Sequence, residues 1–99
     1  MVEIVEDGLS KDNIKTMELK DTIDIMMSAD YKDRFKAEYW QLRDRYKKLT
    51  GMLTKWDNGQ LDFTPTCPRS LYTKQINAMH EYLDVLERRA ELENVNLTP

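Results

Sequence analysis

Ninety-nine residues with a formal net charge of −3 and 40% hydrophobic residues suffice for one small domain with a modest core, but not for two. Three glycines and three prolines are too few for a fold of many short strands and turns. The single cysteine, Cys67, excludes an internal disulfide framework and is typical of a reducing compartment. The N-terminus lacks the layout of a signal peptide, and no apolar run has membrane-spanning length, so we expect a cytoplasmic protein.

The first twenty residues are polar, and their isolated apolar side chains follow neither a helical nor a strand period. We therefore expect residues 1–20 to be a flexible or partner-dependent arm, and residues 21–99 to form a single helical domain. At the start of that domain, the segment DTIDIMMS, residues 21–28, predicts a short helix with several large apolar side chains.

The strongest pattern in the chain predicts a helix from about Asp30 to Trp56. Asp30 is a suitable N-cap, and the pair Asn58-Gly59 supplies a helix stop. Between them a heptad seam continues over three heptads, with spacings of 4 and 3. The seam consists of Phe35, Tyr39, Leu42, Tyr46, Leu49, Leu53 and Trp56. At about 1.5 Å per residue, this helix would be about 40 Å long.

A second long helix is predicted over residues 68–94, with Thr66 or Cys67 as its cap. Its seam has the same spacing and consists of Tyr72, Ile76, Met79, Leu83, Leu86 and Ala90. Two long helices joined by a short loop predict an all-α fold, an antiparallel two-helix hairpin with a short N-terminal helix. Two apolar loop residues, Leu61 and Phe63, are expected to plug the end of the hairpin.

The second helix carries more apolar side chains than packing against one neighbour requires. Tyr82-Leu83 and Val85-Leu86 are adjacent pairs that widen its apolar face beyond a two-helix seam. One explanation is that the short N-terminal helix folds back over this face. The other, which we prefer because so short an element cannot cover ~40 Å of helix, is self-association into a homo-oligomeric bundle through Tyr82, Val85 and Leu86.

Charge is distributed unevenly along the chain, with a net charge of −4 over residues 1–42, +4 over residues 43–80 and −3 over residues 81–99. In an antiparallel hairpin, this distribution makes the loop end basic and the end with the chain termini acidic. The stretch TPTCPRSLYTKQ, residues 64–75, starts a helix with cations at the basic end, although helix N-termini favour anions.

We therefore predict that this helix start binds an anionic ligand of the nucleotide type through unpaired N–H groups, cations and hydroxyls. The candidate ligand-binding residues are Arg69, Lys74, Ser70, Thr66, Tyr72, Arg43 and Lys47. In the alternative interpretation, Arg69 and Lys74 are solvated surface cations, or they pair with Asp57 and Asp62 across the loop.

Other chemistry is sparse. His80, the single histidine, has no partners at metal-ligand spacing, so we expect no metal site. It also follows Cys67 by more than three helical turns, too far to act as its base, and we expect Cys67 to be a small buried cap residue. No phosphate loop, dinucleotide fingerprint or nucleophile elbow occurs. We expect a protein that is not an enzyme, needs no cofactor and does not bind DNA sequence-specifically.

The run SADYKDRFKAEYWQLRDRYKKL, followed after the loop by TCPRSL and AMHEYLDVLERRAELENVNL, resembles small bacteriophage and prophage proteins of the crAss-phage-related small protein family. The resemblance covers about residues 23–97 and carries no catalytic residues. It implies an accessory protein in the cytoplasm of an infected bacterium, with a counter-defence role in which it sequesters a cyclic nucleotide immune signal. The alternatives are an inhibitor that binds a host nuclease or another defence protein, as anti-CRISPR proteins do, and a phage assembly or regulatory adaptor.

Overall fold

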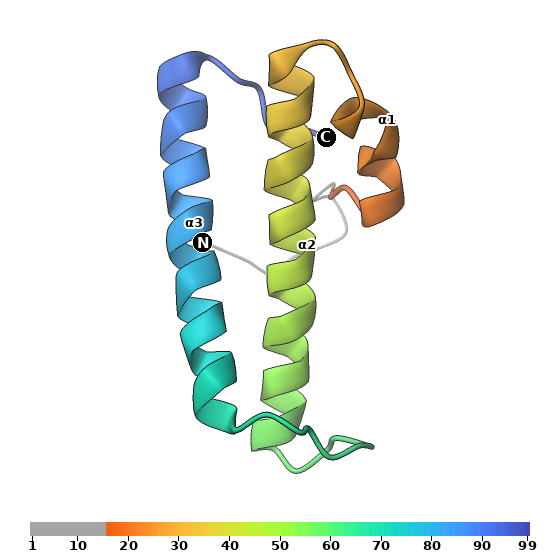
Figure 1. Cartoon of the computed structure of the whole chain (residues 1–99), viewed down its shortest axis with the longest axis vertical. Helices are drawn as coiled ribbons and strands as arrows, with labels where there is room; N and C mark the ends of the chain where they lie inside the picture. The colour runs from red at the N-terminus through yellow and green to blue at the C-terminus, as the bar shows by residue number, and fades with distance from the viewer. Residues whose placement is uncertain (1–15) are drawn as a thin grey trace.

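The computed structural model describes residues 16–99. In chain order the elements are the 3-10 helix η2 (Leu19–Thr22) and the α-helices α1 (Ile23–Met26), α2 (Tyr31–Asp57) and α3 (Arg69–Glu93). Figure 1 shows α2 and α3 side by side and antiparallel, with α1 on the side of α2 away from α3. The described part of the chain contains no strand. The predicted all-α hairpin is therefore confirmed, and the bounds of both long helices agree with the sequence to within one residue.

Both ends of α2 lie where the sequence marks them. The Asp30 carboxylate accepts a 2.9 Å hydrogen bond from the backbone N–H of Lys32, which satisfies one of the unpaired amides of the first turn. At the other end, Gly59 has a φ of 69°, a left-handed conformation that glycine adopts without a Cβ penalty. Its N–H donates to the carbonyl of Trp56 and closes the last turn.

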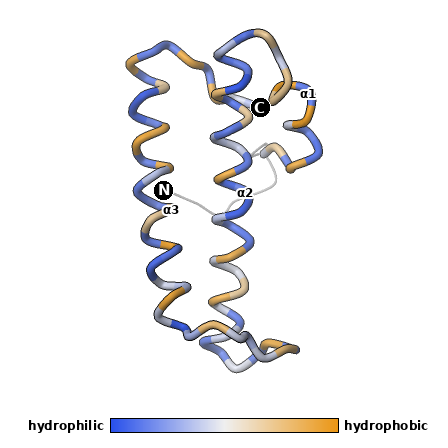
Figure 2. The backbone as a smooth tube through the Cα atoms, in the orientation of Figure 1, coloured by the Kyte–Doolittle hydropathy of each residue, from blue (hydrophilic) through white to orange (hydrophobic). Residues whose placement is uncertain are grey.

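The two predicted seams face each other and form the core of the hairpin. Phe35 and Tyr39 of α2 pack with Leu83, Leu86 and Ala90 of α3, and all five side chains are buried. Apolar and polar positions alternate along both helices at the helical period in Figure 2. The spacing of 4 and 3 therefore buries one stripe of each helix, while most of the remaining surface stays in water.

Trp40 is buried although it lies off the α2 seam, and the chain after α3 explains its burial. Asn94 adopts a left-handed conformation (φ 59°) that ends α3, and the tail then crosses to α2. There Val95 joins the core, and the carbonyl of Leu97 accepts a 2.7 Å hydrogen bond from Trp40 Nε1. The sequence did not predict this contact, because an irregular tail has no period to detect.

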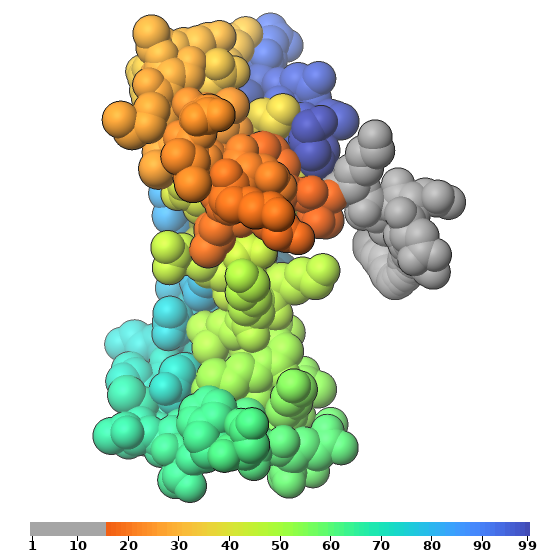
Figure 3. Space-filling model, turned by 90° about the vertical axis from the view of Figure 1, so that its right-hand side faces the viewer, coloured from red at the N-terminus to blue at the C-terminus, as the bar shows by residue number. Residues whose placement is uncertain are grey.

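The short N-terminal helix packs on α2 and leaves α3 uncovered. η2 and α1 both lie against α2, and within the described residues neither lies against α3. Figure 3 shows this segment, in red and orange, covering one end of α2. Its anchor is Thr22, which is 1% exposed and whose hydroxyl donates to the carbonyl of Leu19 and accepts from Gln41 Nε2. The explanation in which the short helix covers the widened face of α3 is therefore wrong.

Most of the predicted N-terminal arm, residues 1–15, lies outside the described residues. Within residues 16–99, the first helical element begins at Leu19, before the predicted domain boundary at residue 21. The backbone N–H of Glu18 donates to the Asp21 carboxylate, and this local cap gives the 3-10 turn a defined start.

Candidate functional site

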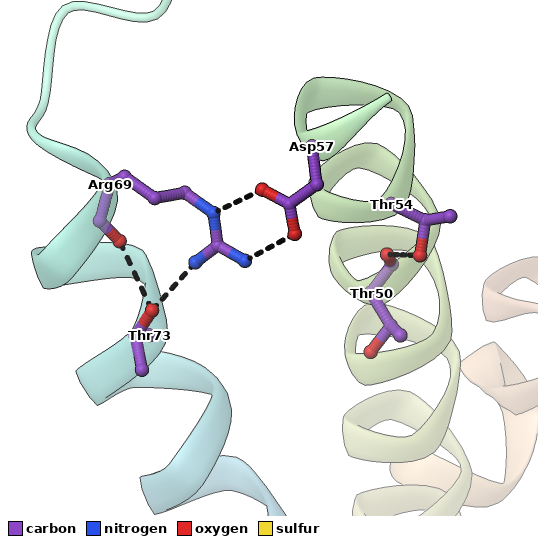
Figure 4. A network of polar contacts seen from close by, with 5 residues as sticks. All are labelled: Thr50, Thr54, Asp57, Arg69 and Thr73. Carbon is purple, nitrogen blue, oxygen red and sulfur yellow. Dashed lines mark hydrogen bonds and ion pairs between the residues drawn. The ribbon is translucent and has the colours of Figure 1, made fainter. Parts of the chain in front are cut away.

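The predicted anion site at the start of α3 depends on Arg69, and the structure gives Arg69 an acidic partner. Its guanidinium donates two parallel hydrogen bonds to the Asp57 carboxylate, each 3.1 Å long, and a third to Thr73 Oγ1 (Figure 4). It also lies 5.9 Å from the centre of the Trp56 ring. The hydrogen bonds from Arg69 lower the pKa of the Asp57 carboxyl. The alternative interpretation, in which Arg69 pairs with Asp57 across the loop, is confirmed. This ion pair links the last residue of α2 to the first residue of α3.

The prediction that Thr66 or Cys67 caps α3 is wrong. Pro68 is the N-cap, and in the described part of the chain no side-chain hydrogen bond caps the backbone N–H groups of the first turn. Proline disfavours the helical conformation in the residue before it, which keeps Cys67 outside the helix. Thr66 and Ser70 are exposed, and Cys67 is exposed as well, instead of buried as expected.

Two other candidates near this end have different surroundings. Tyr72 is half-buried and meets the Trp56 ring edge to face, with ring centres 5.7 Å apart. The aromatic surface that was expected to stack on a base is thus partly used to join the two helices. Lys74 is exposed, one turn after Ser70.

Arg43 and Lys47 do not join Arg69. Arg43 lies over the Trp40 ring, 4.8 Å from its centre. Arg43 precedes Trp56 by thirteen residues, which at ~1.5 Å per residue places it ~20 Å away along α2. Lys47 is exposed on α2. The seven candidate residues therefore do not converge, because their spread along the helices exceeds the reach of one small ligand.

A different set of residues encloses space at the same end of the molecule. A hollow of about 380 Å³, which we call the loop-end hollow, opens between the last turns of α2 and the loop. It is lined by Lys48, Gly51, Met52 and Lys55 of α2 and by Gln60, Leu61, Asp62 and Phe63 of the loop. Gln41, which contacts η2, precedes Lys48 by seven residues and Lys55 by fourteen. The hollow therefore lies on the α2 face that η2 and α1 cover further along, away from α3.

Phe63 forms a wall of the loop-end hollow instead of plugging the hairpin. Its side chain is 54% exposed, whereas Leu61 is half-buried. The prediction that both residues plug the end of the hairpin is therefore wrong for Phe63. An exposed aromatic ring beside an open volume is a surface on which a planar group can stack.

Two lysines, Lys48 and Lys55, line the hollow. They are two helical turns apart, which is about 10 Å along the axis of α2. Lys48 Nζ lies 3.0 Å from Asp44 Oδ2, and its side chain remains 68% exposed. Asp44 Oδ2 is buried and receives no hydrogen bond within residues 16–99, so this contact is a charge pair only. Lys55 makes no ion pair with any described residue. Lys55 is consequently the cation of the hollow that is best placed to meet an anion.

Gly51 keeps the lining of the loop-end hollow open. A glycine inside a helix costs about 1 kcal/mol relative to alanine. Packing does not require it here, since a Cβ at this position would have no atom of the described structure within 4 Å. The absence of a side chain at Gly51 leaves open space in the hollow between Lys48 and Lys55.

The hollow therefore combines two lysines and one carboxylate, Asp62, with an aromatic wall, apolar surface and the amide of Gln60, and its excess of positive charge suits a planar anion. The sequence prediction placed Lys48 and Lys55 in the basic part of the chain but not among the candidate site residues. The sequence pattern that could have predicted this site is the spacing of the two lysines with Gly51, because positions 48, 51 and 55 share one face of a helix.

A separate group of polar contacts joins the first half of α2 to the last turns of α3. The buried Tyr39 hydroxyl donates a 2.7 Å hydrogen bond to the Glu87 carboxylate. Burial, and after it this hydrogen bond, raises the pKa of Tyr39 to about 12. Arg89 pairs with Glu93 at 2.8 Å and lies over the Phe35 ring. These groups satisfy one another, so their contribution is to helix pairing.

Within residues 16–99, no group of three or more histidine, cysteine, aspartate or glutamate side chains is arranged to hold a metal ion. Over the same residues, no helix combines the length and apolarity needed to cross a bilayer.

Comparison with known proteins gives one family match. Residues 29–92 match the family described as Sequestin, and this span includes α2, the loop and nearly all of α3. Neither the curated proteins nor the solved structures give a match.

Proposed function

This chain belongs to the Sequestin family, and we propose that it sequesters a small anionic ligand of the nucleotide type in the loop-end hollow. The family name suggests a binding role rather than a catalytic one. The prediction that the protein is not an enzyme agrees with that name. The resemblance to small phage proteins is a separate prediction that the family match leaves untested.

The observation that carries the proposal is the meeting of two lysines, an exposed aromatic ring and unfilled space in one hollow. Its volume of about 380 Å³ lies within the range of small-ligand pockets, which is about 300–1,000 Å³. A phosphate gains a charge-assisted contact from a lysine, while a base gains apolar contact with Met52 and Phe63. The hollow thus offers separate contacts for the two chemical parts of a nucleotide.

We further propose that the ligand is a cyclic nucleotide immune signal and that the role is counter-defence in an infected bacterium. A cyclic dinucleotide presents phosphates and planar bases together, which suits two lysines about 10 Å apart along α2 beside an aromatic wall. Sequestration needs no catalytic group: the protein only has to lower the concentration of free signal, in proportion to its affinity and abundance.

The test is calorimetric titration of the full chain with cyclic dinucleotides, cyclic oligonucleotides and cyclic ADP-ribose isomers. We expect at least one member of this panel to bind, and its affinity to fall as salt rises, because the lysine–phosphate contacts are screened. The matched control is the corresponding nucleoside without phosphate, which should bind much more weakly. If no member binds, nucleotide sequestration is wrong, and the inhibitor hypothesis, binding to a host defence protein, replaces it.

A further inference from the structure

A second heptad stripe runs along the outside of α3. Its members are Leu71, Gln75, Ala78, Tyr82, Val85, Arg89 and Leu92, with spacings of 4, 3, 4, 3, 4 and 3. Each member is exposed, and the large apolar ones are 45–73% exposed. The stripe lies one residue before the buried seam at almost every position. α3 therefore carries two adjacent heptad seams, of which α2 occupies only one.

We propose that a second copy of this chain occupies the outer stripe, through an antiparallel pairing of α3 with α3. A helix with one neighbour needs one apolar stripe, and a second stripe at coiled-coil spacing is typical of a helix with a second helical neighbour. A second α3 supplies a partner of the same length and spacing. This inference is independent of the proposed ligand, because the loop-end hollow is formed by α2 and the loop.

Charges beside the stripe decide the orientation. With the stripe at heptad positions a and d, position e holds Tyr72, Met79 and Leu86, which belong to the inner seam, and Glu93 at the end of α3. The g positions, on the open side, hold Lys74, Glu81 and Arg88. A parallel pair sets g against e, where the one charged position within α3 is Glu93, which already accepts hydrogen bonds from Arg89 and Tyr31. An antiparallel pair sets g against g, where charges of opposite sign can meet.

The same charges select a register. When Tyr82 of one copy packs on Val85 of the other, Glu81 lies beside Arg88 of the other copy, and the two-fold symmetry forms this ion pair twice. This register overlaps roughly 20 residues of each α3, about 30 Å. Sliding one copy by a heptad in one direction brings the two Glu81 side chains together, and in the other direction the two Arg88 side chains. Like charges at such positions are destabilising.

Two side chains of the stripe are held by contacts from α2. The Tyr82 hydroxyl donates to the Glu38 carboxylate, which fixes the ring at the edge of the stripe. Arg89 lies over Phe35 and pairs with Glu93, so its guanidinium is drawn toward α2. The structure also narrows the sequence-predicted interface: Tyr82 and Val85 are open to a partner, whereas Leu86 is 1% exposed and belongs to the intramolecular core.

The test is sedimentation velocity of the full chain from about 5 to 200 μM. A single helix pair buries less area than a standard interface of about 1,600 Å², so we expect a monomer–dimer equilibrium in the micromolar range. Val85→Glu should remain monomeric throughout, since it places unpaired charges in the stripe. Asn77→Glu, an exposed position outside the stripe and its g flank, should associate as the wild type does. Circular dichroism should show equal helix content in all of them, because the changed side chains are exposed.

A charge exchange tests orientation and register. Glu81→Arg should weaken the dimer at least about 10-fold, and adding Arg88→Glu in the same chain should restore it, because the pair is re-formed with reversed sign. A wild type that is monomeric at every concentration overturns the proposal; the stripe would then be covered by the first fifteen residues or by another protein. Association that survives Val85→Glu places the interface elsewhere. Failure of the double variant to recover rejects the antiparallel register.

Discussion

Lys55→Ala should weaken the binding of a cyclic dinucleotide by about 10- to 150-fold, because one charge-assisted contact contributes about 1.5–3 kcal/mol. Lys55 lines the loop-end hollow and pairs with no acidic side chain among the described residues. Its loss should change the stability of α2 by at most about 1 kcal/mol, the contribution of a cation in the last turn of a helix. Calorimetric titration of both proteins with the panel member that binds best measures the ratio of affinities.

Two control substitutions of lysine distinguish a local contact between Lys55 and the ligand from general electrostatic attraction. Lys47→Ala removes the same charge from an exposed position outside the hollow, and Lys74→Ala removes it from the predicted site on α3. Each should change the affinity less than about 3-fold at physiological salt, where exposed charges are screened beyond about 8 Å. If Lys47→Ala lowers the affinity as much as Lys55→Ala does, the ligand responds only to the overall charge of the protein. If only Lys74→Ala lowers the affinity, the binding site lies at the start of α3.

Gly51→Leu completes this test by changing shape instead of charge. The new side chain extends into the loop-end hollow and should strongly reduce binding, whereas the helix should become more stable by up to about 1 kcal/mol. Binding and stability are expected to move in opposite directions, which general damage to the fold could not produce. Undiminished affinity in this variant would show that the ligand does not use the hollow.

Trp40→Ala should be among the most destabilising substitutions, with a cost of about 3–5 kcal/mol. Trp40 is 4% exposed and is the residue on which the chain after α3 packs. Its removal leaves a cavity and also leaves the Leu97 carbonyl without the indole N–H. Small domains have a total stability of about 5–15 kcal/mol, so this change removes a large part of it. Urea unfolding followed by circular dichroism measures the change in the free energy of unfolding.

Trp40→Phe keeps the test interpretable if the alanine variant does not fold. It retains an aromatic ring but loses the hydrogen bond to Leu97, and should cost clearly less than the alanine variant. Trp56→Ala is the second comparison, since Trp56 is half-buried at the loop end and should be less costly. A cost below about 1 kcal/mol for Trp40→Ala would contradict the role of the C-terminal tail as part of the core.

The two long helices could be predicted because each depends on local information. A period of 3 and 4 that continues over three heptads specifies which side chains can share a face, and Asp30 and Gly59 mark the ends of α2 by their own chemistry. The packing of Val95 and Leu97 on Trp40 could not be found in this way. It depends on where the chain travels after Asn94, which no periodic pattern encodes.

The site was harder to predict for a related reason. The start of α3 does carry an excess of cations, as the sequence indicates. The anionic partner of Arg69, however, is the Asp57 carboxylate, twelve residues earlier in the chain. Only the folded loop brings that carboxylate within 3.1 Å. The loop-end hollow likewise needs loop and helix together: Phe63 was expected to be buried and instead forms a wall. Net charge located the basic end, but contacts between segments decide which of its cations remain available.

The most direct test of binding in the loop-end hollow is a ¹H–¹⁵N NMR titration of the full chain with the cyclic nucleotide that binds best in calorimetry. The backbone amides of Gly51, Gln60 and Phe63 should show the largest shift changes, because these residues line the hollow. The amides of Arg69 and Ser70 should move little, since Arg69 is already held by Asp57. The largest changes at Arg69 and Ser70, with the amides of the hollow unmoved, would contradict the assignment and return the ligand to the start of α3.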